Sequence, residues 1–224
     1  MQTETLIIGK GDDIITMILD NLSSENENGA RRFWGSNENG KITIYNNLDL
    51  PINSPFFHSE FEIDILNQLE ISDYNKWILG IYKPNLKKKI IDSLGIYGHI
   101  NFVNCIHKGL DISKTSQLGI GCLINSKVSI AAHTIIKNYV SINRHVSIGH
   151  HTIIEDYVSI NPGCNIAGHC HIGEGTTIGI GSQILDGITI GKNTIIGAGS
   201  IVTRDIPDGV VAWGSPCKIK NTNE

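Results

Sequence analysis

Residues 142–172 read INRHVSIGHHTIIEDYVSINPGCNIAGHCHI, and an isoleucine stands at every sixth position of this stretch. The period continues in both directions without a gap, so that Ile, Leu or Val occupies every sixth position from Ile106 to Val202. An α-helix repeats about every 3.6 residues and a β-strand about every 2, and neither period explains a strict six. A hexapeptide period is typical of a parallel β-helix, in which three short strands make one triangular coil. The sequence therefore predicts a solenoid over nearly half of the chain.

A second regularity lies two residues before each of these aliphatic positions, where the side chain is small or β-branched, as at Val146 and Thr152. Both inward positions of each strand are then apolar or small, as a narrow triangular core requires. Cys122, Cys164 and Cys170 occupy this position, which predicts core residues rather than metal ligands or redox groups. The odd total of five cysteines, without a CxxC pair, also argues against a disulfide framework.

The period also predicts which residues stack. Eighteen residues complete one coil, so the repeats make about five coils, and residues eighteen apart lie on successive coils at roughly the 4.8 Å spacing of strands. His150 and Gly168 should therefore stand on the same edge, one coil apart. Glycine follows the aliphatic residue in several repeats, for example at Gly149, where we expect the chain to turn.

A column of three histidines follows from the same spacing, because His133, His151 and His169 are eighteen residues apart. A ladder that faces solvent or another subunit is the ordinary explanation. A metal site is the alternative, since histidine is a common metal ligand. We expect no metal in this protein.

The first hundred residues have another character, because apolar runs of strand length alternate with helical patterns. This alternation predicts a small open α/β sheet, and we expect three parts: residues 1–103, the β-helix at 104–203 and a C-terminal tail at 204–224. We expect Lys87–Lys89 to be an exposed helix face. The predicted strands lie at 5–8, 41–45, 77–82 and 100–103, the predicted helices at 14–22, 60–69 and 84–94, and a polar loop at 23–31.

Charge and hydropathy exclude other classes of protein. The formal net charge is −4, so no broad basic surface invites nucleic acid. No apolar run approaches the roughly 20 residues that a membrane helix needs, and we find no signal-peptide pattern. We therefore expect a cytoplasmic protein without membrane insertion.

The segment 148–168, IGHHTIIEDYVSINPGCNIAG, is followed by IGEGTTIGIGSQI and, near the C-terminus, by AWGSPCKIK. Together they resemble the bacterial sugar acetyltransferases of the hexapeptide superfamily, in particular the sialic acid O-acetyltransferase and PglD-like group. The resemblance is strong over 106–220 and looser over 80–94. It implies a small Rossmann-like N-terminal domain, a left-handed β-helix, a homotrimer, and acetyl transfer from acetyl-CoA to an amine or hydroxyl of a sugar, often nucleotide-linked. The period alone does not give the handedness.

The resemblance also implies roles for single residues. His150 matches the catalytic base, and Gly168, in an Ala-Gly step, matches the backbone N–H that binds the oxyanion at the CoA thioester. Ser159 stands where the family has a second histidine that contacts the donor, and we expect it to face outward and reach a neighbour's site. Ile180 matches a position that lines the pantetheine channel. The residues expected near the nucleotide end of CoA are Gly214, Pro216 and Lys218.

The chain departs from the family after the base, where an acidic residue is usual and His151 stands here. Either a carboxylate such as Glu155 or Asp156 orients His150, or the two histidines tune each other.

A second departure lies in the first turn of the N-terminal domain, where the family has a glycine-rich sequence. Here Gly9 and Gly11 flank a lysine, and Asp12 and Asp13 follow. Two carboxylates would repel a phosphate unless they bond ribose hydroxyls. These four residues are the candidates for binding a nucleotide-linked sugar, and a domain that merely completes the fold is the alternative.

Acyl transfer from a thioester needs a base for the nucleophile and a donor for the oxyanion, and His150 with Gly168 supplies both. The hypothesis is an acetyl-CoA-dependent sugar acetyltransferase of surface glycan synthesis. The alternatives are a non-catalytic trimeric β-helix scaffold and an acetyltransferase with a non-sugar acceptor.

Overall fold

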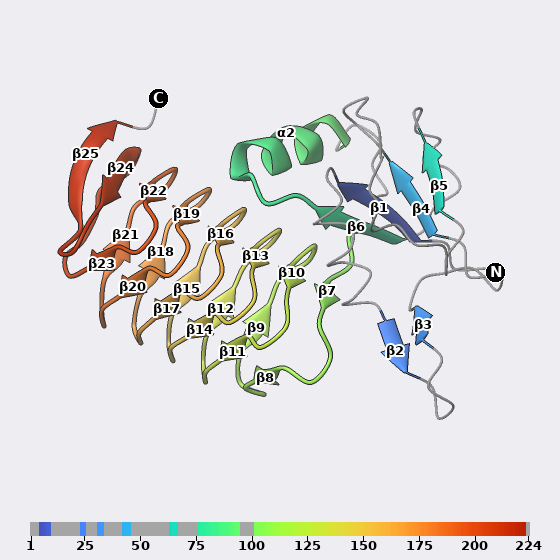
Figure 1. The fold of residues 1–224 in the computed structure, drawn as a ribbon, viewed down its shortest axis with the longest axis horizontal. Helices are drawn as coiled ribbons and strands as arrows, with labels where there is room; N and C mark the ends of the chain where they lie inside the picture. The colour runs from blue at the N-terminus through green and yellow to red at the C-terminus, as the bar shows by residue number, and fades with distance from the viewer. Residues whose placement is uncertain are drawn as a thin grey trace.

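The computed structural model of the chain describes residues 5–9, 23–25, 31–33, 42–45, 63–66, 76–94 and 101–222. The helix predicted at 14–22 lies outside these residues. The described residues fall into a small N-terminal sheet, one helix beside it, and a long solenoid (Figure 1). Among them, no helix has both the length and the apolar character that a bilayer crossing demands.

The N-terminal sheet has four parallel strands in the order β5-β4-β1-β6. A separate antiparallel pair and the helix complete this region. The elements are β1 (Thr5–Gly9), β2 (Ser23–Glu25), β3 (Arg31–Phe33), β4 (Ile42–Tyr45), β5 (Ile63–Leu66), β6 (Lys76–Gly80) and α2 (Pro84–Leu94). The helix begins at a proline, whose fixed φ and missing N–H suit the first helical position.

Two sequence predictions for this region are wrong. Residues 60–69 contain the strand β5 rather than a helix, and the polar stretch 23–31 contains β2 and the start of β3 rather than only a loop. Strand β5 has only four residues, which is too short for its periodicity to separate a strand from a helix. The last predicted strand, 100–103, contributes only a single parallel bridge between Phe102 and Trp77.

Seventeen strands of two residues each form the solenoid, which confirms the prediction of a three-sided stack of coils. The strands lie on three parallel faces, here called the first, second and third face in chain order. The first face holds β7 (Cys105–Ile106), β10 (Leu123–Ile124), β13 (Ser141–Ile142), β16 (Ser159–Ile160), β19 (Thr177–Ile178) and β22 (Ile195–Ile196). The second holds β8 (Asp111–Ile112), β11 (Ser129–Ile130), β14 (Ser147–Ile148), β17 (Asn165–Ile166), β20 (Gln183–Ile184) and β23 (Ile201–Val202). The third holds β9 (Gln117–Leu118), β12 (Ile135–Ile136), β15 (Ile153–Ile154), β18 (His171–Ile172) and β21 (Thr189–Ile190).

The coils stack in the predicted register, since Ile148 pairs with Ile166 and Ile154 with Ile172, eighteen residues later. Seventeen strands make between five and six coils, slightly more than the sequence suggested. The arrangement is consistent with the left-handed β-helix that the family resemblance implies. The C-terminal tail extends the first face: β24 (Val210–Trp213) pairs beside β22, and β25 (Lys218–Thr222) pairs antiparallel with β24.

The interior of the solenoid contains the repeat aliphatics together with the small residues that precede them. The cysteines Cys122, Cys164 and Cys170 are buried among them, as predicted, and every cysteine of the chain is a free thiol. Buried threonines satisfy their hydroxyls within the stack; the Thr152 Oγ1 donates to the Ala167 carbonyl at 3.0 Å. The buried hydroxyl groups of the core thus have hydrogen-bond partners.

The glycines after the aliphatic residues allow successive coils to approach closely and do not form the turns, which corrects the sequence interpretation. A Cβ added to Gly149 would lie 2.5 Å from the carbonyl carbon of Ala167 and from the nitrogen of Gly168, so only glycine lets these coils approach. The turn itself falls three residues after the aliphatic, where the backbone is left-handed in every coil position except Thr115 and Asp205. His151, with φ of +57°, occupies one of these positions.

The helix α2 is fastened to the first face by Lys87, which is completely buried. Its ammonium donates to the carbonyls of Tyr139 at 3.0 Å and Val158 at 3.3 Å and to the Oγ of Ser159 at 3.0 Å. The prediction of an exposed helix face at 87–89 is therefore wrong for Lys87, although Lys88 and Lys89 are exposed. The helical pattern could not show that a solenoid face covers one of the three lysines.

Candidate functional site

The corner between the second and third faces, here called the second corner, brings the predicted base and the predicted oxyanion donor together. His150, Gly168 and Asp186 each lie two residues beyond a strand of the second face, on three successive coils. A Cβ added to Gly168 would lie 3.0 Å from the Nε2 of His150 and 3.0 Å from the Oδ1 of Asp186. The structure thus places His150 and Gly168 one coil apart on one edge, as the spacing predicts.

The missing side chain at Gly168 leaves room for both neighbours. The imidazole of His150 leans over the Gly168 backbone, and no described residue accepts a hydrogen bond from the Gly168 N–H. Asp186 is a site residue that the sequence reasoning missed. Its distance of eighteen residues from Gly168 is the signal that would have found it.

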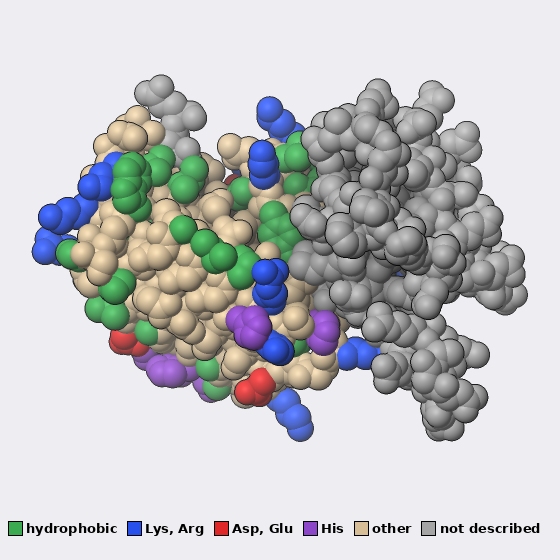
Figure 2. Space-filling view, in the orientation of Figure 1, with side chains coloured by type: hydrophobic (Ala, Val, Ile, Leu, Met, Phe, Trp, Pro, Cys, Tyr) green, Lys and Arg blue, Asp and Glu red, His purple; other side chains and the backbone are tan. Residues whose placement is uncertain are grey.

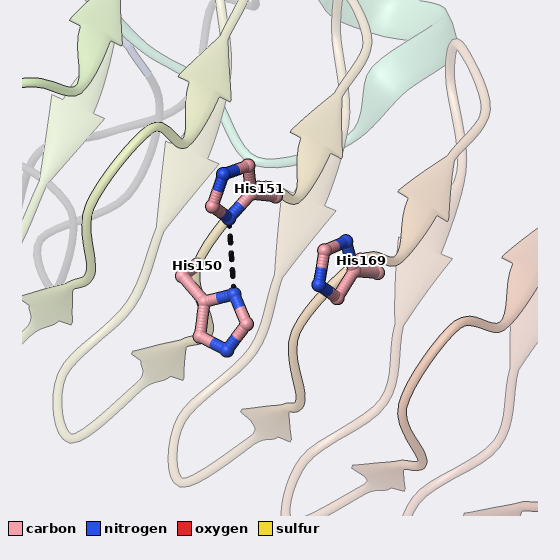
Figure 3. Close-up of side chains that lie close together, drawn as sticks. All are labelled: His150, His151 and His169. Atoms are coloured by element: carbon pink, nitrogen blue, oxygen red, sulfur yellow. Dashed lines mark hydrogen bonds between the residues drawn. The ribbon is translucent and has the colours of Figure 1, made fainter.

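His150 has a partner of its own, because its Nδ1 lies 3.1 Å from the Nδ1 of His151 (Figure 3). The two rings are nearly perpendicular, at 87°. One Nδ1 carries the proton and the other accepts it. If His150 donates through Nδ1–H, its Nε2 keeps a free lone pair.

Neither carboxylate considered from the sequence takes this place. Glu155 accepts hydrogen bonds from the Nζ of Lys137 at 2.6 Å and from the Nε2 of His171 at 3.0 Å. Partial burial raises the pKa of Glu155, but the hydrogen bonds from Lys137 and His171 outweigh it and lower the pKa below its usual range. Asp156 accepts from the backbone nitrogen of Asn138. The structure therefore favours the second alternative from the sequence, in which His151 rather than a carboxylate orients His150.

The predicted histidine column is present on the second corner, with His133, His151 and His169 all at φ near +57°. Ring centroids are 4.9 Å apart for the first pair and 5.0 Å for the second, which is stacked at 14°. Histidine side chains reach the surface of the solenoid (Figure 2), and His150, His151 and His169 are exposed. Desolvation, and then the imidazoles of His133, His169 and His150, lower the pKa of His151 below its ordinary value. His151 is therefore neutral at pH 7 and able to accept a proton from its neighbour.

The residues predicted along the CoA channel lie on the corner between the first and second faces, here called the first corner. Ile180 follows the first face, between β19 and β20, and is 54% exposed. The carbonyl of Gly214 accepts a hydrogen bond from Ile201 at 3.0 Å, so the turn with Gly214, Pro216 and Lys218 lies at the end of this same first corner. Within one chain the structure does not bring these residues to His150.

Ser159 points out of the solenoid, as expected, but the segment before α2 buries it, so it does not reach the surface. It is 2% exposed, donates its Oγ–H to the Tyr82 carbonyl and accepts from Lys87. The segment leading into α2 covers this part of the first face. Of the predicted nucleotide-binding residues, Gly9 closes β1, whereas Gly11, Asp12 and Asp13 lie outside the described residues.

Known proteins share this architecture. Residues 169–204 match the family described as bacterial transferase hexapeptide (six repeats). A sequence comparison with curated proteins found no match.

Solved structures match the whole chain. A mutant of perosamine N-acetyltransferase from Caulobacter crescentus, in complex with CoA and GDP-perosamine, is 23% identical with a TM-score of 0.78, over 99% of this chain and 99% of that one. The acetyltransferase domain of PglB from Neisseria gonorrhoeae, in complex with acetyl coenzyme A, is 21% identical with a TM-score of 0.79, over 98% and 100%. WeeI from Acinetobacter baumannii is 18% identical with a TM-score of 0.75, over 97% and 100%. Residues 169–204 therefore match bacterial transferase hexapeptide repeats, and the chain shares its fold with perosamine N-acetyltransferase and with the acetyltransferase domain of PglB.

Proposed function

We propose that this protein is an acetyl-CoA-dependent acetyltransferase that acts on an amino or hydroxyl group of a nucleotide-linked sugar, in the synthesis of surface glycans. The observation that carries the proposal is the position of the His150 imidazole, on one exposed corner, in the space that a side chain at Gly168 would occupy. The complexes of perosamine N-acetyltransferase with CoA and GDP-perosamine, and of the PglB domain with acetyl coenzyme A, support both substrates.

In the proposed reaction the Nε2 of His150 removes the proton of the sugar amine or hydroxyl as this group attacks the thioester carbon. His151 accepts the Nδ1–H of His150 and so keeps the Nε2 lone pair directed at the acceptor. The N–H of Gly168 stabilises the tetrahedral oxyanion. The intermediate then collapses, the C–S bond breaks, and the imidazolium of His150 returns the proton to the leaving CoA thiolate.

His151 differs from an acidic partner because it is uncharged at neutral pH. It orients His150 without adding a negative charge that would stabilise the imidazolium. We therefore assign His151 a positioning role, in the place where the resembling family has a carboxylate.

The separation of the two corners supports a site between protomers. The proposed homotrimer sets the first corner of one protomer, with Ile180 and the Gly214 turn, against His150 on the second corner of its neighbour. CoA would lie along that seam. The proposed Rossmann-like domain would hold the nucleotide end of the sugar through Gly9, Gly11, Asp12 and Asp13.

The decisive experiment replaces His150 by alanine and measures CoA thiol release with acetyl-CoA and a panel of UDP-, GDP- and dTDP-amino sugars. A histidine base contributes about 10²–10⁴-fold, so we expect kcat to fall at least ~100-fold. The circular dichroism spectrum and the oligomeric state should not change, because His150 is exposed. Lys192→Ala, an exposed position after β21 on the corner between the third and first faces, serves as the control. Activity that survives in His150→Ala would remove His150 from the role of base.

A scaffold without catalysis is the competing function, and the presence of His151 in place of an acidic residue favours it. Calorimetric titration with acetyl-CoA separates the two functions. A scaffold shows no binding at millimolar acetyl-CoA, whereas the enzyme must bind it.

A further inference from the structure

We propose that His150, His151 and His169 form a binding site for a divalent transition-metal ion of the Zn²⁺ type, and that occupancy of this site inhibits the protein. The inhibitory half of the proposal rests on the proposed function. The binding half does not, because it depends only on the three imidazoles.

The geometry of the three rings carries the inference. Each ring offers a nitrogen such that the three atoms lie within 4.8 Å of one another (Figure 3). The Nδ1 atoms of His150 and His151 are already 3.1 Å apart. Two ligands of one tetrahedral Zn²⁺, each at about 2.0–2.1 Å, are roughly 3.3 Å apart. This pair therefore needs almost no rearrangement to share an ion.

The third imidazole is held close by the coil stacking. The backbone nitrogen of His169 donates to the carbonyl of His150 at 2.9 Å, and its ring lies 4.9 Å from the His150 ring and 5.0 Å from the His151 ring. His151 and His169 share the same left-handed φ on successive coils, so their side chains leave the backbone in the same direction. The ligands are thus organised by the solenoid before an ion arrives.

The chemistry of the donors selects the class of metal. Imidazole nitrogens suit Zn²⁺, Cu²⁺ and Ni²⁺, whereas Mg²⁺ and Ca²⁺ prefer carboxylate and carbonyl oxygens, and this group of three contains none. Three imidazoles leave a fourth tetrahedral position, which water fills in exposed sites.

Binding at either ring nitrogen of His150 removes the base. If the ion binds both Nδ1 atoms, it displaces the proton between them, and the proton of His150 moves to its own Nε2. The Nε2 is then an N–H donor and cannot accept a proton from the sugar. If the ion binds the Nε2 instead, it occupies the lone pair directly. Both arrangements stop the proposed reaction without any change of fold.

The test uses the full-length protein without a polyhistidine tag, titrated with Zn²⁺ in a calorimeter and with Co²⁺ by visible absorption. We expect one ion per chain and at least a ~10-fold increase of Kd for His169→Gly, because a ligand is lost. Glycine is chosen since it adopts the positive φ of this position without strain. The matched control is His145→Gly, another exposed corner histidine with φ of +58°. No saturable binding, or equal Kd values for wild type and His169→Gly, would overturn the site.

The inhibitory half has its own readout. Acetyl transfer by the wild type should fall as Zn²⁺ saturates the site and return when EDTA is added. The inhibition constant should rise in His169→Gly by the same factor as the Kd, with each protein compared with its own metal-free rate. Full activity at saturating Zn²⁺ would overturn this half. If the metal-free protein transfers no acetyl group to any sugar, the proposed function fails, and the titrations still decide whether the metal site exists.

Discussion

The Nδ1 atoms of His150 and His151 lie 3.1 Å apart and form one hydrogen bond. The two imidazole rings are nearly perpendicular. Consecutive residues can meet in this way because His151 has a left-handed backbone that turns its side chain back toward His150. The contact leaves the Nε2 of His150 directed at the Gly168 backbone. The positioning role proposed for His151 can therefore be tested by substitution.

Substitutions at position 151 separate positioning from charge. His151→Gly suits the positive φ but removes the acceptor of the His150 Nδ1–H, and we expect kcat to fall about 10-fold or more while KM changes little. His151→Asp restores an acceptor that carries a negative charge. Because an opposite charge favours the imidazolium, the acid limb of the kcat/KM profile should move to higher pH in this variant. Unchanged kcat in His151→Gly would show that His150 needs no partner.

Gly168→Ala tests the space over which the His150 ring lies. The added methyl group would meet the His150 and Asp186 side chains at about 3 Å, and these exposed groups can move aside. The N–H is retained, so a loss of activity reports the displacement of the base. We expect a melting temperature close to that of the wild type and a fall in kcat of about 10–100-fold.

Gly149→Ala provides the contrast within the same corner. Its methyl group would meet the backbone of Ala167 and Gly168 at 2.5 Å, and the backbone cannot move aside without separating the coils. This variant should lose several kcal/mol of stability, as overpacking does. Equal melting temperatures for Gly168→Ala and Gly149→Ala would contradict the claim that only Gly149 is packed against backbone that cannot move.

Lys87 makes stability depend on pH. Burial lowers the pKa of Lys87 from 10.5 to about 7. Between these values the unfolded chain binds more protons than the folded chain, so the free energy of unfolding rises as pH rises. Relative to Lys87→Met, the wild type should gain up to about 2 kcal/mol between about pH 7.5 and 9. Urea unfolding at several pH values in this range measures the free energy of unfolding of both proteins. The same pH dependence in the wild type and in Lys87→Met would refute a buried Lys87 that titrates near pH 7.

Ser159→Ala distinguishes a structural from a cofactor-binding serine. Its Oγ bonds both Tyr82 and Lys87 in the buried contact beneath α2. The variant should lose about 1–3 kcal/mol of stability, because buried partners are left unpaired. Its KM for acetyl-CoA should equal that of the wild type when both are measured well below their melting temperatures. A raised KM at full stability would place Ser159 in the donor site after all.

The solenoid and the juxtaposition of His150 with Gly168 follow from the sequence because one period governs both. A spacing of eighteen residues determines the coil, the face and the corner of every residue in the repeats. The period does not show which outward face another segment covers, and for that reason the burial of Ser159 and Lys87 was missed. It also says nothing of contacts between side chains of consecutive residues, which depend on the backbone angle at His151.

Strand β5 shows the limit in the N-terminal region. Its four residues have neither the length nor the flanking signals that distinguish a strand from a helix, and the pairing with β4 decides the outcome. Such pairing is a tertiary contact and leaves no local trace in the chain.

The contact between α2 and the first face also has a practical consequence for anyone dividing this protein. Ser141 and Ser159 donate to the carbonyls of Ile81 and Tyr82, and Lys87 is buried in the same seam. Expression of the hexapeptide repeats alone, from the boundary near residue 104, would remove β6 and α2 and expose the part of the first face that they bury. The truncated product should self-associate or melt early, and a working fragment has to retain residues from β6 onward.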